Sequence, residues 1–326
     1  MSVVIYDSTD SGAPVLTGQA GSFVNLCDTL LDGVGTAYGS KPKAGWTKVF
    51  SGANKGVYRT ADGVGYYRVQ HDGAQGAAST RELVVRGAEG ATDVDTLVDA
   101  YPTVAQVADA LCVWRVSGDT TATARPWIAM ATPNFFQILV SWGAVGSSGD
   151  RYKMGKFFRR GSAYAHSYLV NTRNVANSTA ASVAASTSAN FMENSYNNKL
   201  WAMRDYSGAV KSVQAALLTR GAGGAGVTPG RSGPPMPDSN GEILREPSTI
   251  LLNARGTTAS SSPTIGGYLP NTWWPLHGSY GSAARLDVFG DLAYNAAAQF
   301  LLVSQPIGGV GLHLVWETTD TWDPYG

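Results

Sequence analysis

The stretch GVYRTADGVGYYRVQ, residues 56–70, decides the fold class. Apolar and polar residues alternate in Tyr58-Arg59-Thr60 and again in Tyr67-Arg68-Val69-Gln70, which is the period of a strand buried on one face. Between them, Ala61-Asp62-Gly63 contains the Asp-Gly pair that is typical of a tight hairpin turn. The stretch therefore predicts two antiparallel strands, Gly56–Thr60 and Tyr66–His71.

The same pattern of short strands between glycine-rich turns extends in both directions along the chain. A two-residue Ser207-Gly208 spacer predicts a second hairpin. The further predicted strands are Ser2–Tyr6, Trp46–Phe50, Arg81–Arg86, Leu111–Ser117, Trp127–Ala131, Phe135–Trp142, Lys199–Tyr206, Ala209–Thr219, Thr249–Asn253, Arg285–Phe289, Phe300–Ser304 and Val310–Trp316. Strands that recur at this spacing predict a mainly β protein, either a β-sandwich or barrel-like sheets, with long ordered loops.

One segment near the start has helical rather than strand periodicity. In GSFVNLCDTLLDGVG the polar residues Asn25, Asp28 and Asp32 fall on one face and the apolar residues on the other, which predicts an N-terminal helix over Ser22–Asp32 docked on a sheet. The apolar residues at helical spacing are Phe23, Leu26, Cys27, Leu30, Leu31 and Val34. Ser22 is the predicted N-cap, and the glycines that follow can end the helix. A partner-binding helix is the alternative interpretation of the same stripe.

A second, weaker helix is predicted over Thr103–Leu111, after Pro102. Its valines make it the weaker of the two, because β-branched side chains lose freedom in a helix.

Composition excludes several classes of protein. The 326 residues carry 24 Lys and Arg against 24 Asp and Glu, and the zero net charge argues against a nucleic-acid binder. No run approaches the roughly eighteen apolar residues of a membrane-spanning helix. The start, MSVVIYDSTD, lacks the basic and apolar regions of a secretory signal. We therefore expect synthesis in a cytoplasm, with neither nucleic acid nor membrane as a partner, and two buried thiols at Cys27 and Cys112.

Two loop regions interrupt the strands, at Asn171–Asn190 and at Gly221–Gly241. The second begins GAGGAG and continues PGRSGPPMPDSNG, and it divides the chain into a region 1–220, a Gly/Pro-rich arm 221–247 and a C-terminal β region 248–326 that could complete the same domain. Such an arm cannot bury enough apolar surface to offset the entropy of ordering its backbone. Contacts from a neighbouring copy are the expected source of order, and the candidate interface residues there are Gly221, Gly224, Pro229, Pro234 and Pro235.

No catalytic pattern is present. The histidines, His71, His166, His277 and His313, include no pair four residues apart, so the zinc-hydrolase motif is absent. There is no GxSxG, and GAGGAG is followed by a Pro-Gly pair rather than by the helix that a dinucleotide-binding loop needs. The sequence predicts no enzyme and no cofactor, and it interprets His71 as the end of a strand.

Two oxygen-rich stretches are weak candidates for a cation site. Asp93, Asp95 and Asp99 lack the EF-hand spacing, and a turn-capping role for Asp93 is the alternative. Asp238–Glu242 contains an Asn-Gly pair, which is first of all a turn signal. We therefore predict no metal site.

The tryptophans have two interpretations, core packing inside strands or sugar-stacking platforms on a receptor-binding surface. The dipeptide Trp273-Trp274 places its side chains on opposite faces if extended, so one of the two can be exposed. Both are added to the candidate interface.

Six stretches, in this order, are similar to a known family. They are DSTDSGAPVLTGQAGSFVNLCDTLLDGVG (Asp7–Gly35), KPKAGWTKVFSGANKGVYRT (Lys41–Thr60), GATDVDTLVDAYPT (Gly90–Thr103), TARPWIAM (Thr123–Met130), GGYLPNTWWPLHGS (Gly266–Ser279) and DVFGDLAYN (Asp287–Asn295). The chain resembles a family of virion structural proteins of tailed bacteriophages, whose pattern is a short strand, a Gly-Ala-Pro turn, a Gly-x-Ala-Gly turn and an apolar helix. The similarity is weakest over residues 145–245, and Trp273-Trp274 departs from a corner that is usually rich in proline and leucine.

The resemblance implies a place in a virus particle and supplies no catalytic residue. We expect a structural subunit of the tail, neck or baseplate region that assembles with other copies of itself and with neighbouring virion proteins. It would be made in the bacterial cytoplasm and located in the virion. Two alternatives stay open: a capsid decoration protein, and a receptor-binding tail protein that contacts a host surface glycan.

Overall fold

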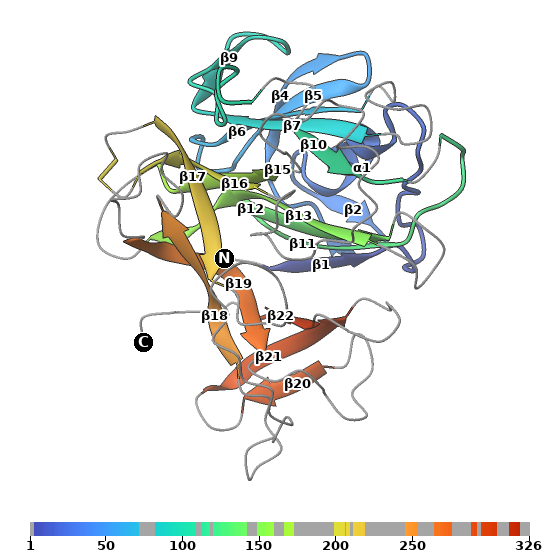
Figure 1. Cartoon of the computed structure of the whole chain (residues 1–326). Helices are drawn as coiled ribbons and strands as arrows, with labels where there is room; N and C mark the ends of the chain where they lie inside the picture. Colours follow the sequence, from blue (N-terminus) through green and yellow to red (C-terminus); the bar gives the residue numbers. More distant parts are fainter. Residues whose placement is uncertain are drawn as a thin grey trace.

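The computed structural model describes residues 3–71, 82–107, 112–117, 120–141, 149–159, 166–172, 199–205, 207–208, 211–218, 245–252, 264–275, 288–291, 295–304 and 313–319. These residues form a mainly β protein in which antiparallel strands are arranged in several sheets and a single helix is present (Figure 1). The predicted fold class is therefore confirmed. The described strands build stacked layers and close no barrel.

The smaller of the two main sheets contains the hairpin that the sequence predicted. Its strand order is β10-β7-β6-β5-β4. The bounds are β4 (Thr47–Gly52), β5 (Lys55–Arg59), β6 (Tyr66–Gln70), β7 (Glu82–Ala88) and β10 (Val113–Arg115). Tyr58 of β5 lies opposite Tyr67 of β6, so the two alternating segments place their tyrosines on the same face, where both are buried.

The larger sheet has thirteen strands in the order β1-β11-β12-β13-β15-β16-β17-β18-β19-β22-β21-β20, with β14 paired to β19 off this path. The bounds are β1 (Val4–Asp7), β11 (Trp127–Thr132), β12 (Phe135–Ser141), β13 (Gly149–Lys156), β14 (Phe158–Arg159), β15 (Tyr168–Thr172), β16 (Lys199–Arg204), β17 (Lys211–Leu218), β18 (Arg245–Leu252), β19 (Thr264–Pro275), β20 (Val288–Asp291), β21 (Asn295–Ser304) and β22 (His313–Glu317). The predicted antiparallel pairing around Ser207-Gly208 is confirmed, but the two-residue spacer is wrong, because the pair nearest the turn is Arg204 with Lys211.

Two small hairpins complete the described strands. They are β2 (Thr36–Tyr38) with β3 (Lys41–Pro42), and β8 (Gly90–Ala91) with β9 (Leu97–Val98).

Four strands of the larger sheet, and the start of a fifth, had no predicted counterpart or lay in a predicted loop. The four are β13, β14, β15 and β19, and the fifth is β18, whose predicted part begins at Thr249. In β13 the polar residues Arg151 and Lys153 alternate with Tyr152 and Met154, but both faces of the strand are buried. The strand β15 extends to Thr172, into the predicted loop at Asn171–Asn190, whose remainder lies outside the described residues.

Two hydrophobic cores lie on opposite faces of the larger sheet. The first lies between the five-stranded sheet and the strands β1, β11–β13, β15 and β16, and it contains Trp46, Trp114 and Trp127. The second lies on the other face of these strands and is closed by β18, β19, β21 and β22, which contribute Ile250, Leu269, Leu301 and Trp316 among others. Figure 1 shows the resulting stack, with the five-stranded sheet at the top and β20–β22 at the bottom.

The N-terminal helix α1 spans Ser22–Leu30, two residues fewer than predicted. Leu31 still donates its N–H to Cys27 O, but Asp32 leaves the helix and forms a parallel bridge with Trp46. The predicted apolar face is confirmed for Phe23, Leu26, Cys27, Leu30 and Leu31, which are all fully buried. It is wrong for Val34, which is 91% exposed because the helix ends before it. The predicted buried thiols at Cys27 and Cys112 are confirmed as well.

The predicted N-cap is wrong. The N-cap is Gly21, in the left-handed conformation, and its residue type offers no side-chain bond. Ser22 is already helical, and its Oγ accepts a hydrogen bond from Thr17 N at 2.9 Å instead. The glycine is favoured here because a positive φ costs it nothing sterically.

The second predicted helix is wrong over its described part. Thr103–Val107 forms a turn in which Thr103 and Gln106 exchange backbone–side-chain hydrogen bonds, at 2.9 and 3.2 Å. This is the reciprocal pattern that opens many helices. Here the Gln106 amide then donates to Ser212 O at 2.8 Å, so the turn is docked on β17. Residues 108–111 lie outside the described part.

Within the part of the chain that the structure describes, no helix has the length and apolar character needed to span a membrane.

Candidate functional site

Three clusters of side chains share one composition. In each, an aspartate carboxylate accepts hydrogen bonds from a tyrosine hydroxyl and from a lysine ammonium. We call them Tyr–Asp–Lys triads, and they are Tyr38–Asp10–Lys41, Tyr58–Asp28–Lys48 and Tyr168–Asp62–Lys156. All three connect elements that are far apart in sequence, so they are the first places to look for chemistry.

The first triad lies beside β1. Tyr38 Oη donates to Asp10 Oδ2 at 2.9 Å, and Lys41 Nζ lies 2.9 Å from the same oxygen. Tyr38 and Lys41 come from the β2–β3 hairpin, and Asp10 from the turn after β1. The hairpin is held further by Tyr6 Oη, which donates to Pro42 O at 2.7 Å.

The second triad fixes α1 on the five-stranded sheet. Tyr58 Oη donates to Asp28 Oδ1 at 2.6 Å, and Lys48 Nζ contacts Asp28 Oδ2 at 2.9 Å. Asp28 lies on the helix, while Tyr58 and Lys48 lie opposite each other on β5 and β4. The polar edge of the amphipathic helix therefore binds the same sheet that its apolar face covers.

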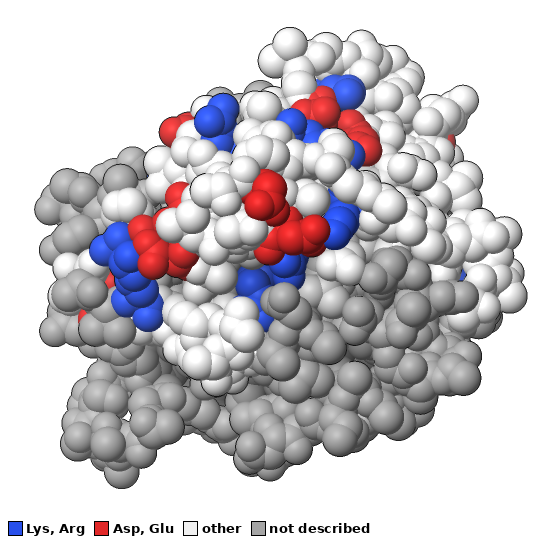
Figure 2. Space-filling view, turned by 90° about the horizontal axis from the view of Figure 1, so that it is seen from above, with Lys and Arg blue, Asp and Glu red and all other residues white. Residues whose placement is uncertain are grey.

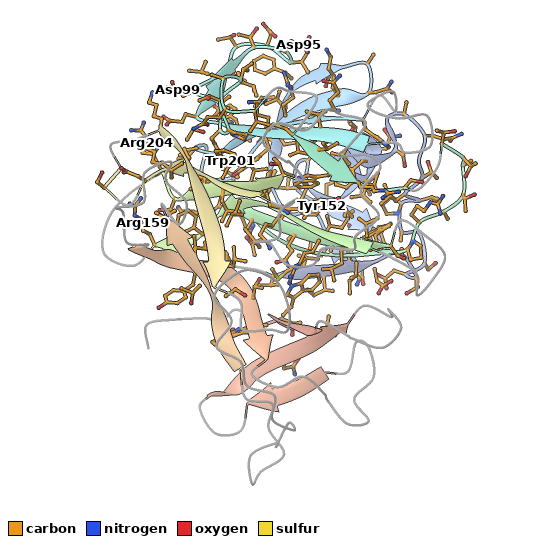
Figure 3. The ribbon with its side chains drawn as sticks, viewed as in Figure 1. Asp95, Asp99, Tyr152, Arg159, Trp201 and Arg204 are labelled. Carbon is orange, nitrogen blue, oxygen red and sulfur yellow. The ribbon has the colours of Figure 1, made fainter. Side chains whose placement is uncertain are left out.

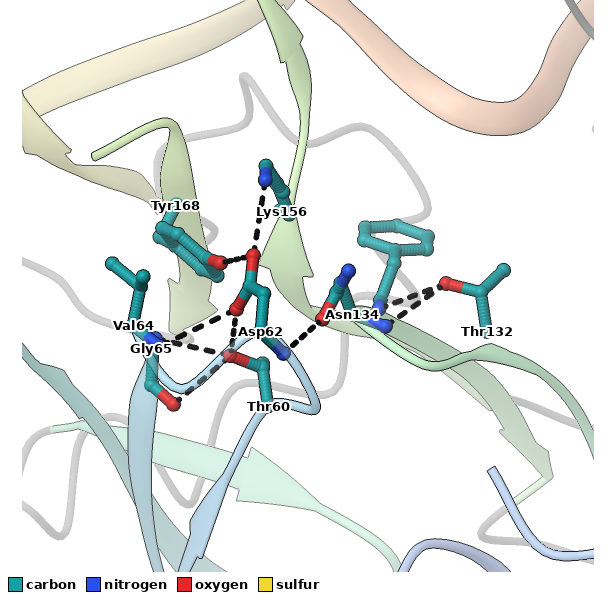
Figure 4. A network of polar contacts seen from close by, with 9 residues as sticks. Thr60, Asp62, Val64, Gly65, Thr132, Asn134, Lys156 and Tyr168 are labelled. Atoms are coloured by element: carbon teal, nitrogen blue, oxygen red, sulfur yellow. Dashed lines mark hydrogen bonds and ion pairs between the residues drawn. The ribbon is translucent and has the colours of Figure 1, made fainter. Parts of the chain in front are cut away.

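The third triad docks the β5–β6 turn on the larger sheet (Figure 4). Asp62 Oδ2 accepts from Tyr168 of β15 and, at 3.0 Å, from Lys156 Nζ of β13. Its Oδ1 accepts from Thr60 Oγ1 at 2.8 Å, and its backbone N donates to Asn134 Oδ1 at 3.0 Å. The Asp-Gly signal of the hairpin thus has a second role, because its aspartate joins the two sheets.

A glycine permits the close approach at this junction. Gly155, next to Lys156, has φ +132°, and a Cβ built there would lie 2.4 Å from Asn134 O and 2.5 Å from Phe135 Cα. Because both neighbours are backbone atoms, they cannot move aside as a side chain would. Gly155 thus lets β13 pass the Asn134 turn and lets Lys156 N donate to Asn134 O at 2.7 Å.

The electrostatics of the triads favour a structural role. Burial, and then the aspartates to which they donate, raise the pKa of Tyr38, Tyr58 and Tyr168 far above the ordinary phenol value. These hydroxyls therefore stay protonated near neutral pH and act as donors to carboxylates. A general acid or base needs a pKa near the working pH, and none of these groups has one.

Two of the carboxylates have lowered pKa values. Partial burial by itself raises the pKa of Asp62, but hydrogen bonds from Tyr168, Lys156 and Thr60 outweigh it and lower the pKa below 3.8. At Asp10, burial is likewise outweighed by bonds from Lys41, Tyr38 and the Asp7 N–H, so its pKa is also lowered.

We expect acid to weaken the fold through these two groups. Because their folded pKa values lie below 3.8, the stabilisation is fully present only well above that pH. The stabilisation is lost as pH falls through 3.8 towards the folded pKa values. The reason is that the two carboxylates take up protons at a higher pH in the unfolded chain than in the folded chain. Urea unfolding followed by circular dichroism should give a midpoint that drops between about pH 5 and about pH 3. The double variant Asp10→Asn/Asp62→Asn should show a smaller drop, and an equal drop would contradict the assignment.

The aspartates considered as cation ligands form ion pairs and cap a turn instead. Asp93 Oδ1 accepts from the N–H groups of Asp95 and Thr96 at 2.7 and 2.9 Å, so the turn-capping interpretation is confirmed. Asp95 pairs with Lys55 at 2.6 Å, and Asp99 pairs with Lys211 of β17. Among the described residues no group of three metal-ligating side chains comes together. Asp238–Glu242 lies outside them.

These ion pairs attach the β8–β9 hairpin to both main sheets, through Lys55 of β5 and Lys211 of β17. Arg204 of β16 adds a two-pronged contact to Glu89, at 2.7 and 3.0 Å. Figure 3 shows Asp95, Asp99 and Arg204 along this side of the molecule. On the face viewed in Figure 2, acidic and basic side chains lie next to each other among many uncharged ones, so the described part of this face carries no large patch of one sign.

His71 has a role that the sequence did not reveal. It follows β6, as predicted for a strand end, and it is fully buried. Its Nδ1 accepts the N–H of Phe23 at 3.1 Å, and its carbonyl accepts the N–H of Gly21 at 2.6 Å. His71 therefore satisfies the free N–H groups at the start of α1 that Gly21 cannot satisfy with a side chain.

Replacing His71 by alanine should lower the free energy of unfolding by about 1–2 kcal/mol, the usual cost of a lost helix cap. The matched control is His166→Ala, because His166 is only half-buried and its Nδ1 has no hydrogen-bond partner among the described residues. Chemical denaturation of both variants tests this. Equal losses at the two positions would show that the cap contributes nothing specific.

Arg151 and Lys153 are two buried cations on the second face of β13. Burial lowers the pKa of Arg151 to about 9. Burial, and then repulsion by Arg151, lowers the pKa of Lys153 well below its ordinary value. The Lys153 side chain is fully buried, which is the first cause of this lowered pKa.

The structure places only part of the candidate interface. Gly221, Gly224, Pro229, Pro234 and Pro235 lie outside the described residues. Trp273 and Trp274 lie in β19, where Trp273 is half-buried and opposite Val315 of β22. Of the other tryptophans, Trp46, Trp114, Trp127, Trp201 and Trp316 are buried, which confirms the core-packing interpretation for them.

The triads were missed by sequence reasoning, which considered Asp62 only as part of a turn and Asp28 only as part of the polar face of a helix. An Asp-Gly turn and a polar helix face are ordinary local signals, and Asp10 carried no signal of its own. No family model matches the chain, and no curated protein matches it. The function is therefore argued from the residues themselves.

Proposed function

We propose that this protein is a structural subunit of a tailed bacteriophage particle, acting as a homo-oligomer in the tail, neck or baseplate region. The proposal starts from the ordered similarity of six stretches to virion structural proteins. It is not an enzyme in this proposal, and it takes no cofactor.

One observation carries the proposal: the first four of the six stretches are linked by contacts, the first to the second and to the fourth, and the second to the third through Lys55 and Asp95. Ser8 and Pro14 of the first stretch bond to Trp127 of the fourth, through Ser8 N to Trp127 O at 3.0 Å and Trp127 Nε1 to Pro14 O at 3.2 Å. The first and second are joined by the bridge between Asp32 and Trp46 and by the triad Tyr58–Asp28–Lys48. A resemblance spread over the sequence thus corresponds to one contiguous piece of structure, as expected if a shared module underlies it.

The use of polar side chains supports the same proposal. Six of the described carboxylates take part in ion pairs, and most of these pairs connect separate elements. They are Asp10, Asp28, Asp62, Glu89, Asp95 and Asp99. Such contacts fix loops on a rigid scaffold, which suits a subunit that works through its surfaces. The arm 221–247 and the Trp273–Trp274 corner remain the proposed contacts to neighbouring copies.

The test is mass spectrometry of purified particles from a phage that encodes this chain. Peptides from it should be present in amounts that correspond to a fixed copy number. A few to tens of copies would support the tail, neck or baseplate, whereas hundreds would support capsid decoration. Absence from mature particles, with the protein present in the infected cell, would overturn the proposal.

A further inference from the structure

The strand β1 is the first strand of the larger sheet, and within the described part of the chain it pairs on one side only, with β11. An edge strand of this kind exposes N–H and C=O groups that can pair with another chain. What happens on the free side of β1 therefore decides whether the larger sheet can be extended.

The register fixes which groups point outward. Ser8 N donates to Trp127 O at 3.0 Å, so Ser8 and, by the period of two, Tyr6 and Val4 direct their backbone groups towards β11. Ile5 and Asp7 direct theirs away from the sheet. A neighbouring strand would pair at these two residues.

Side chains already occupy those positions. Lys41 Nζ donates to Ile5 O at 2.6 Å. Tyr38 Oη accepts the N–H of Asp7 at 3.1 Å and lies 3.4 Å from Asp7 O. Asp10 Oδ2 joins both, because it also accepts the Asp7 N–H at 3.1 Å. The first triad thus takes the place of a strand at the free side of β1, and we call it the β1 edge cap.

The end of the smaller sheet shows the same solution with different residues. At β10, Tyr152 Oη accepts the N–H of Arg115 and lies 3.1 Å from Arg115 O, so one hydroxyl covers both groups. At the other end of that sheet, Lys48 N of β4 donates to Asp32 Oδ1 at 2.7 Å. Recurrence at three edges indicates that blocking strand addition is a feature of this fold.

We propose that the β1 edge cap prevents the larger sheet from pairing with a second copy of this chain, and that removing it allows β1 of one copy to pair with β1 of another. A second copy fits because two antiparallel β1 strands, related by a two-fold axis, present the same outward groups at Ile5 and Asp7 to each other. The inference rests on backbone geometry and is independent of a place in a virus particle.

The test variant is Tyr38→Phe/Lys41→Met, which removes the hydroxyl and the ammonium but keeps the apolar parts of both side chains. Its mass in sedimentation equilibrium should rise towards twice the wild-type value as concentration is raised. The matched control is Tyr58→Phe/Lys48→Met, which makes the same two changes in a triad that covers no outward group of β1. The control should keep the wild-type mass at every concentration.

A third variant separates strand pairing from general aggregation. Adding Ile5→Pro to the test variant removes an outward N–H, which a strand edge tolerates, and should restore the wild-type mass. If the double variant does not fold, Lys41→Met alone replaces it, because Lys41 and Asp10 are each 31% exposed and no buried group is lost. A folded variant that keeps the wild-type mass, or association that Ile5→Pro leaves unchanged, would overturn the proposal.

Discussion

Replacing Trp114 by alanine should lower the free energy of unfolding by about 3–5 kcal/mol, the range for removing a large buried aromatic side chain. Trp114 is fully buried between the two sheets. Its ring stacks on Tyr152 of the other sheet at 4.8 Å and 8°, and meets Phe23 of α1 edge-on at 5.8 Å. Its Nε1 donates to Asn171 O at 2.5 Å. One side chain therefore joins the helix and both sheets.

The variant should be measured by urea unfolding with circular dichroism, because loss of a tryptophan alters the fluorescence signal directly. Trp114→Phe is the matched variant. It keeps an aromatic ring against Tyr152 but loses the bond to Asn171 O, so its loss should be clearly smaller. A loss below about 1 kcal/mol for the alanine variant would contradict the central position of Trp114, since surface substitutions usually stay within that range.

The second large effect is expected at Leu30. Leu30→Ala should lower the free energy of unfolding by about 2–5 kcal/mol, through lost apolar contact and the cavity left behind. Leu30 is fully buried at the end of α1, in the first core. Its carbonyl also accepts the N–H of Ala44 at 2.9 Å, so the neighbouring loop is fixed to the same point and cannot easily collapse into the space.

The control for Leu30 lies four residues further on. Val34 is apolar and near the same helix, but it is 91% exposed. Val34→Ala should therefore change the stability by less than about 0.5 kcal/mol. A loss at Leu30 as small as the loss at Val34 would show that the predicted helix face does not pack, and would favour a partner-binding role for it.

Local patterns were sufficient for the elements whose burial is one-sided. The hairpin at residues 56–70 and the helix face with Phe23, Leu26 and Leu30 were predicted because one face of each is polar and the other enters a core. Where both faces of a strand are buried, the alternation of polar and apolar residues no longer distinguishes a buried face from an exposed one. The strand β13 buries Arg151 and Lys153 on one face and Tyr152 and Met154 on the other, and no strand was predicted there.

The points at which helices begin and end were harder to predict, because residues distant in the sequence determine them. Asp32 leaves α1 to bridge Trp46, and His71 supplies the helix cap expected from Ser22. The Thr103–Gln106 signal of a helix start is a turn docked on β17. In each case a contact with residues distant in the sequence outweighs a local preference worth about 1 kcal/mol.

The sequence by itself determined that the chain is mainly β, that the first hairpin turns at Asp62 and that one helix buries its leucines, because these follow from periodicity and turn chemistry along the chain. Only the tertiary structure decided which tyrosine and lysine each aspartate meets, and that one such triad covers the free edge of β1. The partners are separated by up to 106 residues, as Tyr168 and Asp62 are. No local pattern encodes such pairings, since they arise only when the two sheets pack and bring the strands into register.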